Sequence, residues 1–205
     1  MGIIEVSKIR DKVVNERLVV SEIKRYYDRY VENYFRGAEI IDNNLMNDKI
    51  NLVIENHSFQ YNLRKIENFE KHREFCKHNM QHFLDVARLM YIINLENTLN
   101  IPKYIIYTTA LLHDIGRGQQ YEKGTPHHIA SVEIAKSILA QCKFDSERIE
   151  EIIAAIGSHR NNTGDSNSLS EILYKCDKLS RRCVHCVAID ECNWSVEEKN
   201  FKITY

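Results

Sequence analysis

Four imidazoles and two carboxylates lie at helix-like intervals between residues 82 and 177. They are His82, His113, Asp114, His127, His159 and Asp177. Neutral imidazole and carboxylate are ligands for borderline and hard divalent metals. The gaps between successive positions, 31, 13, 32 and 18 residues, match the lengths of a helix with its loop. Helices of these lengths can return to one point, so the residues could share a metal site.

The His113-Asp114 pair follows an apolar run that ends in Leu111-Leu112. The two leucines are expected to bury one face of the segment, which carries the pair to the rim of a core. Adjacent residues on a helix diverge by about 100°, so both can bind one ion only if the helix ends there. Gly116 supplies an end, because glycine tolerates the left-handed conformation that terminates helices.

Apolar periodicity predicts the helices that would position these residues. An i, i+3, i+4, i+7 stripe runs from Phe83 to Ile93 beside His82. A histidine at the edge of such a stripe is more often a hydrogen-bonded core residue than a ligand. His78, one turn earlier, is expected to be an exposed polar residue, with a place lining a pocket as the alternative. Residues 101–115 are predicted to form the helix that carries the His-Asp pair.

Three further helices are predicted from capping residues. Thr125 is expected to cap a helix that has Pro126 at its first position and His127 and His128 in its first turn. Asp145 caps a helix that ends near His159, and Ser168 caps the helix of Asp177. Alternative interpretations remain for two of the histidines: His127 as a local helix-start residue and His159 as a surface residue.

Composition indicates an all-α protein. The chain has 205 residues, 43% of them hydrophobic, with only two prolines and seven glycines. Its 28 basic and 29 acidic residues leave a net charge of −1, so a main role in nucleic-acid binding is not expected. No apolar run reaches the roughly 18–20 residues that span a bilayer, and no secretory signal is evident. A cytoplasmic protein without a membrane partner is predicted.

The order of these motifs resembles the HD superfamily of metal-dependent phosphohydrolases, whose pattern is H…HD…D, and within it the small two-metal bacterial type. The likeness covers residues 76–182. Its segments are His82-x3-Val86-Ala87, Leu111 to Gly116, His127-x3-Ser131, Ala155 to His159 and Tyr174 to Leu179. Two positions depart from the pattern: Ser131 replaces a glycine, and His128 stands where proline is frequent.

The resemblance implies a helical bundle over residues 71–182 with two metal positions. His82, His113, Asp114 and Asp177 would bind one metal; His127 and His159 would bind a second, with Asp114 as the bridge. Asp114, with His113, would be catalytic by orienting or deprotonating a metal-activated water. Fe, Mn, Co, Ni or Zn would suit this mixed ligand set.

Several cations near these motifs are expected to meet substrate phosphates. Arg117 stands where family members often carry a lysine, and Lys178 and Arg160 follow metal-binding positions. His128 is expected to face substrate. A solvated surface charge is the alternative for each cation. The expected substrate is a small nucleotide, cleaved at a phosphoester or phosphoanhydride; the alternative is a nucleotide-sensing regulatory module without turnover.

The two ends of the chain lie outside the motif region. Residues 1–70 are predicted to be a helical extension that packs on the core or on a second subunit in a homodimer. Residues 183–205 form a tail expected to pack on the bundle. Cys183, Cys186 and Cys192 have spacing typical of a structural zinc or iron–sulfur site. Cys76 is the preferred fourth ligand, with Cys176 as an alternative, and free thiols remain the other interpretation.

Overall fold

The computed structural model describes residues 43–160 and 168–202, and that part of the chain is helical and contains no strand. The predicted all-α class is therefore confirmed. The chain divides after Asn43 into two units, and the account below concerns the second, residues 44–205. Most of the first unit, and with it the first 42 residues of the expected N-terminal extension, lies outside the described residues.

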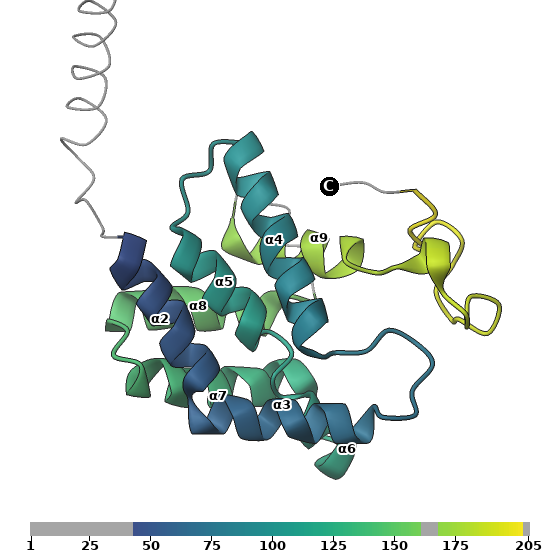
Figure 1. Cartoon of the computed structure of the whole chain (residues 1–205), viewed down its shortest axis with the longest axis horizontal. Helices are drawn as coiled ribbons and strands as arrows, with labels where there is room; N and C mark the ends of the chain where they lie inside the picture. The colour runs from purple at the N-terminus through teal and green to yellow at the C-terminus, as the bar shows by residue number, and fades with distance from the viewer. Residues whose placement is uncertain (1–42, 161–167, 203–205) are drawn as a thin grey trace, which may run out of the picture. The chain divides into compact units, whose positions relative to one another are not determined.

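The described helices follow one another through short connections (Figure 1). Their bounds are α2 Asn43–Glu55, α3 His57–Phe69, α4 Met80–Glu96, α5 Lys103–Leu112, α6 Arg117–Lys123, α7 His127–Gln141, α8 Ser146–Ser158 and α9 Leu169–Leu179. A 3-10 turn, η1, covers Cys183–His185. None of the described helices has the length and apolar character needed to cross a membrane.

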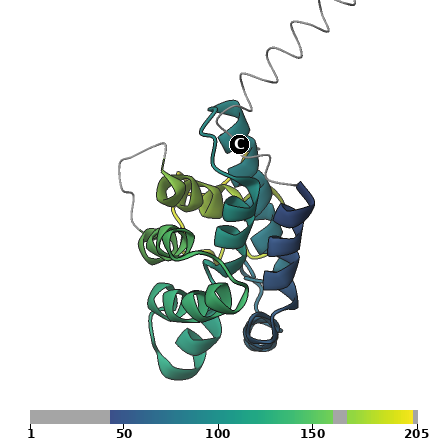
Figure 2. The same ribbon diagram turned by 90° about the vertical axis from the view of Figure 1, so that its left-hand side faces the viewer.

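Helix α5 is the centre of the bundle. It contacts α4, α8 and α9, while α7 packs on α8 and α6 packs on α7. Figure 2 shows α7, α8 and α9 stacked beside α4 and α5. From Ile105 to Leu112 the side chains of α5 are buried, with Tyr107 partly so. The C-terminal end of this enclosed helix, where His113 and Asp114 follow, is thereby fixed inside the protein.

Helices α2 and α3 contribute to the same apolar core as the later helices. Val53 of α2 and Phe59 and Ile66 of α3 are fully buried in it. Part of the expected N-terminal extension therefore packs directly on the bundle. Asn56, between the two helices, caps α3 by accepting hydrogen bonds from the backbone of Ser58 and Phe59.

The capping predictions had mixed outcomes. Asp145 caps α8 as predicted, accepting from the backbone nitrogen of Arg148 at 2.9 Å. Thr125 does not cap α7: the N-cap is Pro126 itself, with φ −54° and ψ 127° and without a side-chain hydrogen bond. Gly116 was also misread, because its φ is −83° and its backbone is not left-handed.

Candidate metal centre

The six predicted ligands come together in two groups that share Asp114. The first group holds His82, His113, Asp114 and Asp177; the second holds Asp114, His127 and His159. Within each group one ligand atom from every residue lies within 4.8 Å of the others. Residues 95 positions apart in the chain thus meet at the ends of α4, α5, α7, α8 and α9.

The first group has the spacing of atoms around one ion. The Nε2 atoms of His82 and His113 are 3.4 Å apart, and Asp177 Oδ1 lies 3.5 and 3.8 Å from them. Asp114 Oδ2 lies 3.5 Å from His113 Nε2. Metal–ligand bonds of about 2.0–2.2 Å produce ligand–ligand separations of this size.

The second group uses the other oxygen of the same carboxylate. Asp114 Oδ1 lies 3.2 Å from His127 Nε2 and 3.7 Å from His159 Nε2, and those two nitrogens are 3.3 Å apart. Asp114 therefore presents Oδ2 to one set of ligand atoms and Oδ1 to the other.

The residues present fit bound metal ions. Asp114 is almost fully buried, yet its Oδ1 has no hydrogen-bond donor among the described residues. A buried carboxylate oxygen without a donor is costly unless a cation satisfies it. The unsatisfied oxygen faces two imidazole nitrogens, which is the donor set that a divalent transition metal would complete.

Each of the four histidines is held with Nε2 toward the site by a partner at Nδ1. His113 and His159 donate to the carbonyls of Ala110 and Ile156, at 2.7 and 2.6 Å. His127 donates from Nδ1 to Gln120 Oε1 at 2.8 Å.

His82 Nδ1 meets Ser180 Oγ at 3.2 Å. Ser180 Oγ donates its proton to the Asp177 carbonyl at 2.7 Å, so the hydroxyl accepts from His82. A proton on Nδ1 leaves the lone pair of a neutral imidazole on Nε2, as metal ligation requires.

Burial and neighbouring charge set the protonation of these groups. Burial, aided by charge on His113, lowers the pKa of His82 to about 4, and burial lowers that of His127 to about 3. Burial would raise the pKa of Asp114, but the charges of Arg117 and His113 outweigh it and hold the pKa well below its ordinary value. The ionised Asp114 carboxylate beside the imidazoles of His82 and His127, whose pKa values are lowered, attracts a divalent cation.

His113 differs from the other histidines. Burial lowers its pKa, but the carboxylates of Asp114 and Asp177 outweigh this effect and raise it. The same negative charges would also favour a metal cation beside His113 Nε2.

Close helix packing sets the position of His127. A Cβ on Gly116 would lie 2.4 Å from the Ser131 nitrogen and 2.6 Å from the His127 carbonyl oxygen. Gly116 also donates its backbone N–H to Ser131 Oγ at 2.9 Å. Only glycine fits after the His-Asp pair, because the backbone of α7 approaches it so closely. This contact, and not the left-handed helix end that the sequence suggested, accounts for glycine at position 116.

The sequence interpretation missed a buried polar network beside the first group. His78, expected to be exposed, is 7% exposed. Glu70 accepts from His78 Nδ1 and from its backbone nitrogen, both at 2.6 Å, and Tyr121 donates to the same carboxylate. His78 Nε2 lies 3.7 Å from Asp114 Oδ2. The i, i+4 spacing of His78 and His82 is the sequence signal that would have placed both on one face.

The predicted substrate-binding residues surround the centre in different environments. Arg117 Nε is bonded to Asp114 Oδ2 at 3.0 Å. Lys178 Nζ is 3.9 Å from Asp177 Oδ2 and stacks on the Tyr174 ring at 3.6 Å. Arg160 is exposed directly after His159, and His128 is partly exposed with its ring near that of His127. All four positions border the metal-binding groups, and none lies remote from them.

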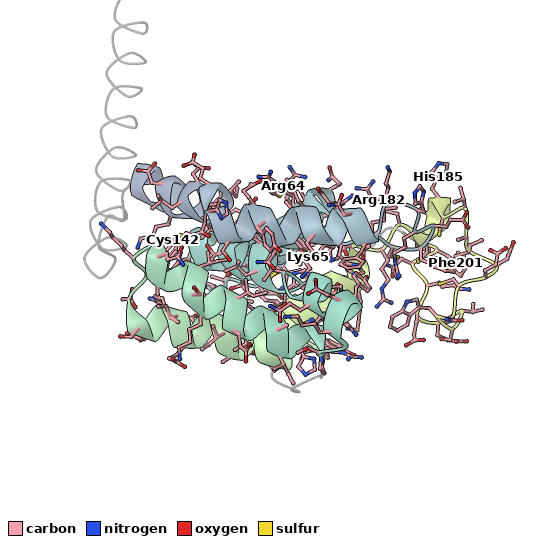
Figure 3. The ribbon with its side chains drawn as sticks, turned by 90° about the horizontal axis from the view of Figure 1, so that it is seen from below. Arg64, Lys65, Cys142, Arg182, His185 and Phe201 are labelled. Carbon is pink, nitrogen blue, oxygen red and sulfur yellow. The ribbon has the colours of Figure 1, made fainter. Side chains whose placement is uncertain are left out.

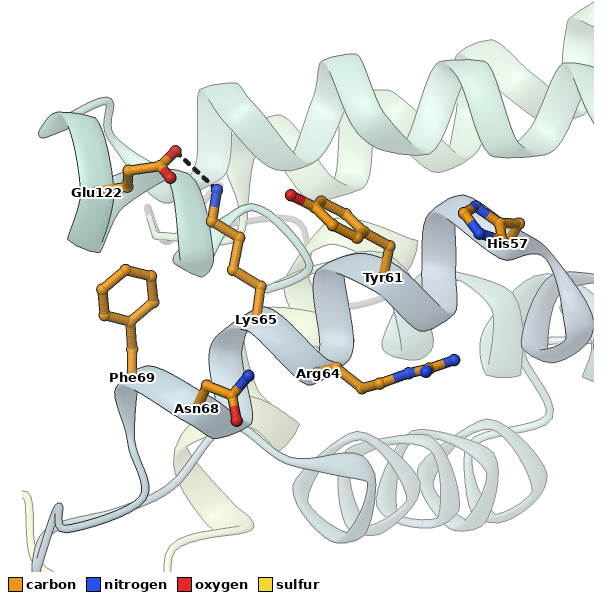
Figure 4. A pocket seen from close by; sticks show the side chains of 7 residues that line it. All are labelled: His57, Tyr61, Arg64, Lys65, Asn68, Phe69 and Glu122. Atoms are coloured by element: carbon orange, nitrogen blue, oxygen red, sulfur yellow. Dashed lines mark hydrogen bonds and ion pairs between the residues drawn. The ribbon is translucent and has the colours of Figure 1, made fainter.

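A separate surface pocket of about 520 Å³ contains none of the six ligands. It lies between α3 and α6, where Lys65 and Glu122 form an ion pair at 2.7 Å (Figure 4). Tyr61 and Phe69 on its wall are 60% and 50% exposed. Its residues offer no convergent ligand group, so the candidate centre is the buried His/Asp site.

Comparison with known proteins agrees with this geometry. The HD domain family model matches residues 79–182, which is half of the chain and includes all six predicted ligands, from α4 to α9. The chain belongs to the HD domain family. No solved structure matches the chain significantly.

This HD protein is similar in sequence to an uncharacterized protein and to enzymes named ribonuclease Y. An uncharacterized protein of Clostridium beijerinckii is 51% identical over 158 residues, covering 77% of the chain and 99% of that relative. Ribonuclease Y of Mycoplasma mycoides is 32% identical over 114 residues, 55% of the chain. Ribonuclease Y of Nitratidesulfovibrio vulgaris is 28% identical over 106 residues. The chain spans a quarter of the first enzyme and 18% of the second.

Proposed function

We propose that this HD protein is a metal-dependent hydrolase of phosphoester or phosphoanhydride bonds in a small phosphorylated substrate, a nucleotide by preference. The observation that carries the proposal is the double use of Asp114, whose two oxygens face two separate sets of ligand atoms. A carboxylate placed in this way is suited to hold two cations side by side. The HD family is one of metal-dependent phosphohydrolases, which supports the same reaction class.

Two metals would be held by the residues already grouped. His82, His113 and Asp177 would hold the first, His127 and His159 the second, and Asp114 would bridge them. Bound metals would polarise a phosphoryl oxygen and lower the pKa of water to about neutral. Fe, Mn, Co, Ni and Zn all accept this mixture of nitrogen and oxygen ligands.

The chain's own residues would bind and orient the substrate. Arg117 fixes Asp114 through Oδ2 and would offer its remaining N–H groups to a phosphate. Lys178 and Arg160, at the ends of α9 and α8, would add positive charge on either side of the centre. His128 has a buried Nδ1 without a hydrogen-bond partner in the described residues, and it would contact the substrate beside His127.

A second candidate substrate is RNA. The relatives named ribonuclease Y cleave RNA according to their name, and they carry an HD domain as this chain does. The shared part is at most a quarter of those enzymes, and the charge of −1 gives this chain no overall attraction to a polyanion. A catalytically weak nucleotide-sensing module is the remaining alternative.

The test begins with metal content per chain of anaerobically purified protein. The His/Asp centre, counted as the metal that is lost in His113→Ala/Asp114→Ala, is expected to hold two equivalents in the wild type, one in His159→Ala, and two in His72→Ala, an exposed histidine used as the control. Turnover is then measured with Mn or Fe on nucleotides and on a short oligoribonucleotide.

Each outcome of that test has a defined meaning. Nucleotide hydrolysis that is lost in His159→Ala supports the proposal. Hydrolysis of the oligoribonucleotide alone would replace it with RNA cleavage. Tight nucleotide binding without turnover would support the nucleotide-sensing module in place of a hydrolase. A protein that stays metal-free after reconstitution would refute the metal centre.

A further inference from the structure

Four cysteines outside the His/Asp centre belong to two segments that lie side by side. Cys76 is in the loop between α3 and α4; Cys183, Cys186 and Cys192 are in the tail after α9. The loop and the tail adjoin in two perpendicular views, with Arg182 and His185 marking the tail (Figures 1 and 3). Arg182 ties the tail to α4 through a 2.6 Å ion pair with Asp85.

The tail, residues 183–202 of the described chain, buries almost no apolar side chains that would hold it in place. Val187 is 91% exposed, and Val184 and Val196 are more than 60% exposed. Between residues 183 and 202 only Cys183 and Ala188 are buried, and η1 is the only helical turn. Segments this small and this poor in apolar core are usually held by disulfides or by a metal.

Cys183 and Cys186 of the tail lie at the two ends of one tight turn, a spacing at which two cysteines can bind the same metal ion. Cys186 donates its backbone N–H to the Cys183 carbonyl at 3.2 Å, which closes the 3-10 turn η1. Cys186 is the residue that directly follows the turn, so the two cysteines lie one 3-10 repeat of three residues apart. A Cys-x2-Cys turn of this kind is the usual half of a structural zinc site.

Cys76 is within electrostatic reach of all three tail thiols. Burial raises the pKa of the Cys76 thiol, and negative charge on Cys183, Cys186 and Cys192 raises it further, against the lowering effect of Arg181. A cation bound to all four sulfur atoms would offset this repulsion at Cys76.

The other two cysteines are excluded by position. Cys176 is fully buried in the core, and burial raises its pKa to about 12, so it remains a thiol. Cys142 lies at the opposite end of the bundle from Arg182 and His185 (Figure 3). The sequence alone left Cys76 and Cys176 as competing fourth ligands, and these environments favour Cys76.

We propose that Cys76, Cys183, Cys186 and Cys192 bind a thiophilic metal centre, either one zinc ion or an iron–sulfur cluster. Each bound thiol would release its proton to solvent as its sulfur bonds to the metal. Among the described residues, only the two His/Asp groups bring ligand atoms of three or more residues within 4.8 Å of one another, so the four sulfur atoms must move closer. Rotation of cysteine side chains on a loop and an irregular tail can supply that movement.

This second centre would connect the two segments that deliver ligands to the first. Cys76 precedes α4, which begins two residues before His82, and Cys183 follows α9, which carries Asp177. Ser180, three residues before Cys183, is bonded to both His82 and the Asp177 backbone. A metal that joins the loop to the tail would therefore support the geometry of the His/Asp centre, without taking part in its chemistry.

The test measures zinc, iron and acid-labile sulfide in full-length protein purified without oxygen. Variants are Cys76→Ser, Cys183→Ser/Cys186→Ser, and Cys142→Ala as a control. The double variant of His113→Ala and Asp114→Ala separates this centre from the other one. One zinc per chain, or iron with sulfide and visible absorption, is expected in the His113→Ala/Asp114→Ala variant, and the wild type should hold it in addition to the metal of its His/Asp centre.

The metal should be lost in both cysteine variants and kept in Cys142→Ala. Circular dichroism confirms that each variant is helical, so that loss of metal is not loss of fold. Retention of the full complement in Cys183→Ser/Cys186→Ser overturns the proposal, as does a wild-type protein with no metal beyond the His/Asp centre. Neither result depends on finding a substrate, so failure here and failure of the proposed hydrolase activity are distinguishable.

Discussion

Gly116 and Ser131 approach so closely that a single methyl group cannot fit between them. A Cβ at position 116 would lie 2.4 Å from the Ser131 nitrogen, and the Gly116 N–H is bonded to the Ser131 hydroxyl at 2.9 Å. This contact docks the turn after Asp114 onto the first turns of α7. Since α7 begins at His127, the same contact sets the separation between Asp114 and His127.

Replacing Gly116 with alanine should therefore disturb both stability and the second metal position. We expect Gly116→Ala to lower the free energy of unfolding by about 1–3 kcal/mol, the usual effect of overpacking. His127 should move away from Asp114, so the affinity for the second metal should fall. Urea unfolding and metal titration measure the two effects.

Gly157→Ala is the matched control for that change. Gly157 lies within α8, and a Cβ there would meet only the Val132 side chain, at an ordinary 3.5 Å. Alanine in a helix interior stabilises by about 0.5–1 kcal/mol relative to glycine. Equal stability of the two variants would contradict the packing argument.

Gln120 should control the second metal through His127. Its Oε1 accepts the proton on His127 Nδ1 at 2.8 Å and so keeps Nε2 toward Asp114. Loss of such a hydrogen bond typically weakens metal binding by about 10–100-fold. We expect Gln120→Ala to show that loss in isothermal titration, whereas Gln119→Ala on the same helix leaves metal affinity unchanged. Equal effects of the two substitutions would mean that Gln120 acts only through the stability of α6.

Much of the site could be predicted from sequence because its ligands sit at recognisable helix ends. His113-Asp114 follows the apolar α5, and His159 follows an α8 that Asp145 caps as expected. Local rules of periodicity and capping place such residues to within a turn. The convergence of six residues follows from helix lengths that allow the chain to return, together with the ordered motifs of the HD family.

Features that depend on contacts between distant segments could not be predicted. The reason for Gly116 is the backbone of α7, which local sequence does not reveal, so a left-handed helix end was the natural but wrong expectation. His78 is buried because Glu70, 8 residues away, accepts its hydrogen bonds, and Tyr121, 43 residues away, donates to the same carboxylate. Burial of a polar residue depends on partners that only the fold provides.

Glu70 should make protein stability depend on acid pH. Burial alone would raise the pKa of this carboxyl, but hydrogen bonds from His78 and Tyr121 and the charge of His78 lower it from 4.5 to about 2. Because the pKa of Glu70 is lower in the folded state than in the unfolded state, the ionised carboxylate stabilises the protein at every pH above about 4.5. That contribution is lost as the pH falls from about 4.5 toward 2. At neutral pH the contribution is on the order of 3 kcal/mol.

Glu70→Gln should remove most of that contribution. The free energy of unfolding at pH 7 should fall by about 2–3 kcal/mol, and the difference from wild type should shrink as the pH decreases below 4.5. Glu67→Gln, an exposed position on the same helix, is the control and should change little at any pH. A wild-type minus Glu70→Gln difference that does not vary between pH 7 and pH 3 would show that the carboxylate charge is not what stabilises the network.

Lys178 should act on substrate binding more than on turnover. Its ammonium is half-buried, and burial lowers its pKa against the raising effect of Asp177. A charged hydrogen bond to a phosphate contributes about 1.5–3 kcal/mol, so Lys178→Gln should raise KM about ten- to a hundredfold with a smaller change in kcat. Lys175→Gln, at an exposed position on the same helix, should leave KM unchanged. Steady-state kinetics with a hydrolysed nucleotide decide the point, and a fall in kcat at constant KM would instead assign Lys178 to stabilising the Asp177 carboxylate.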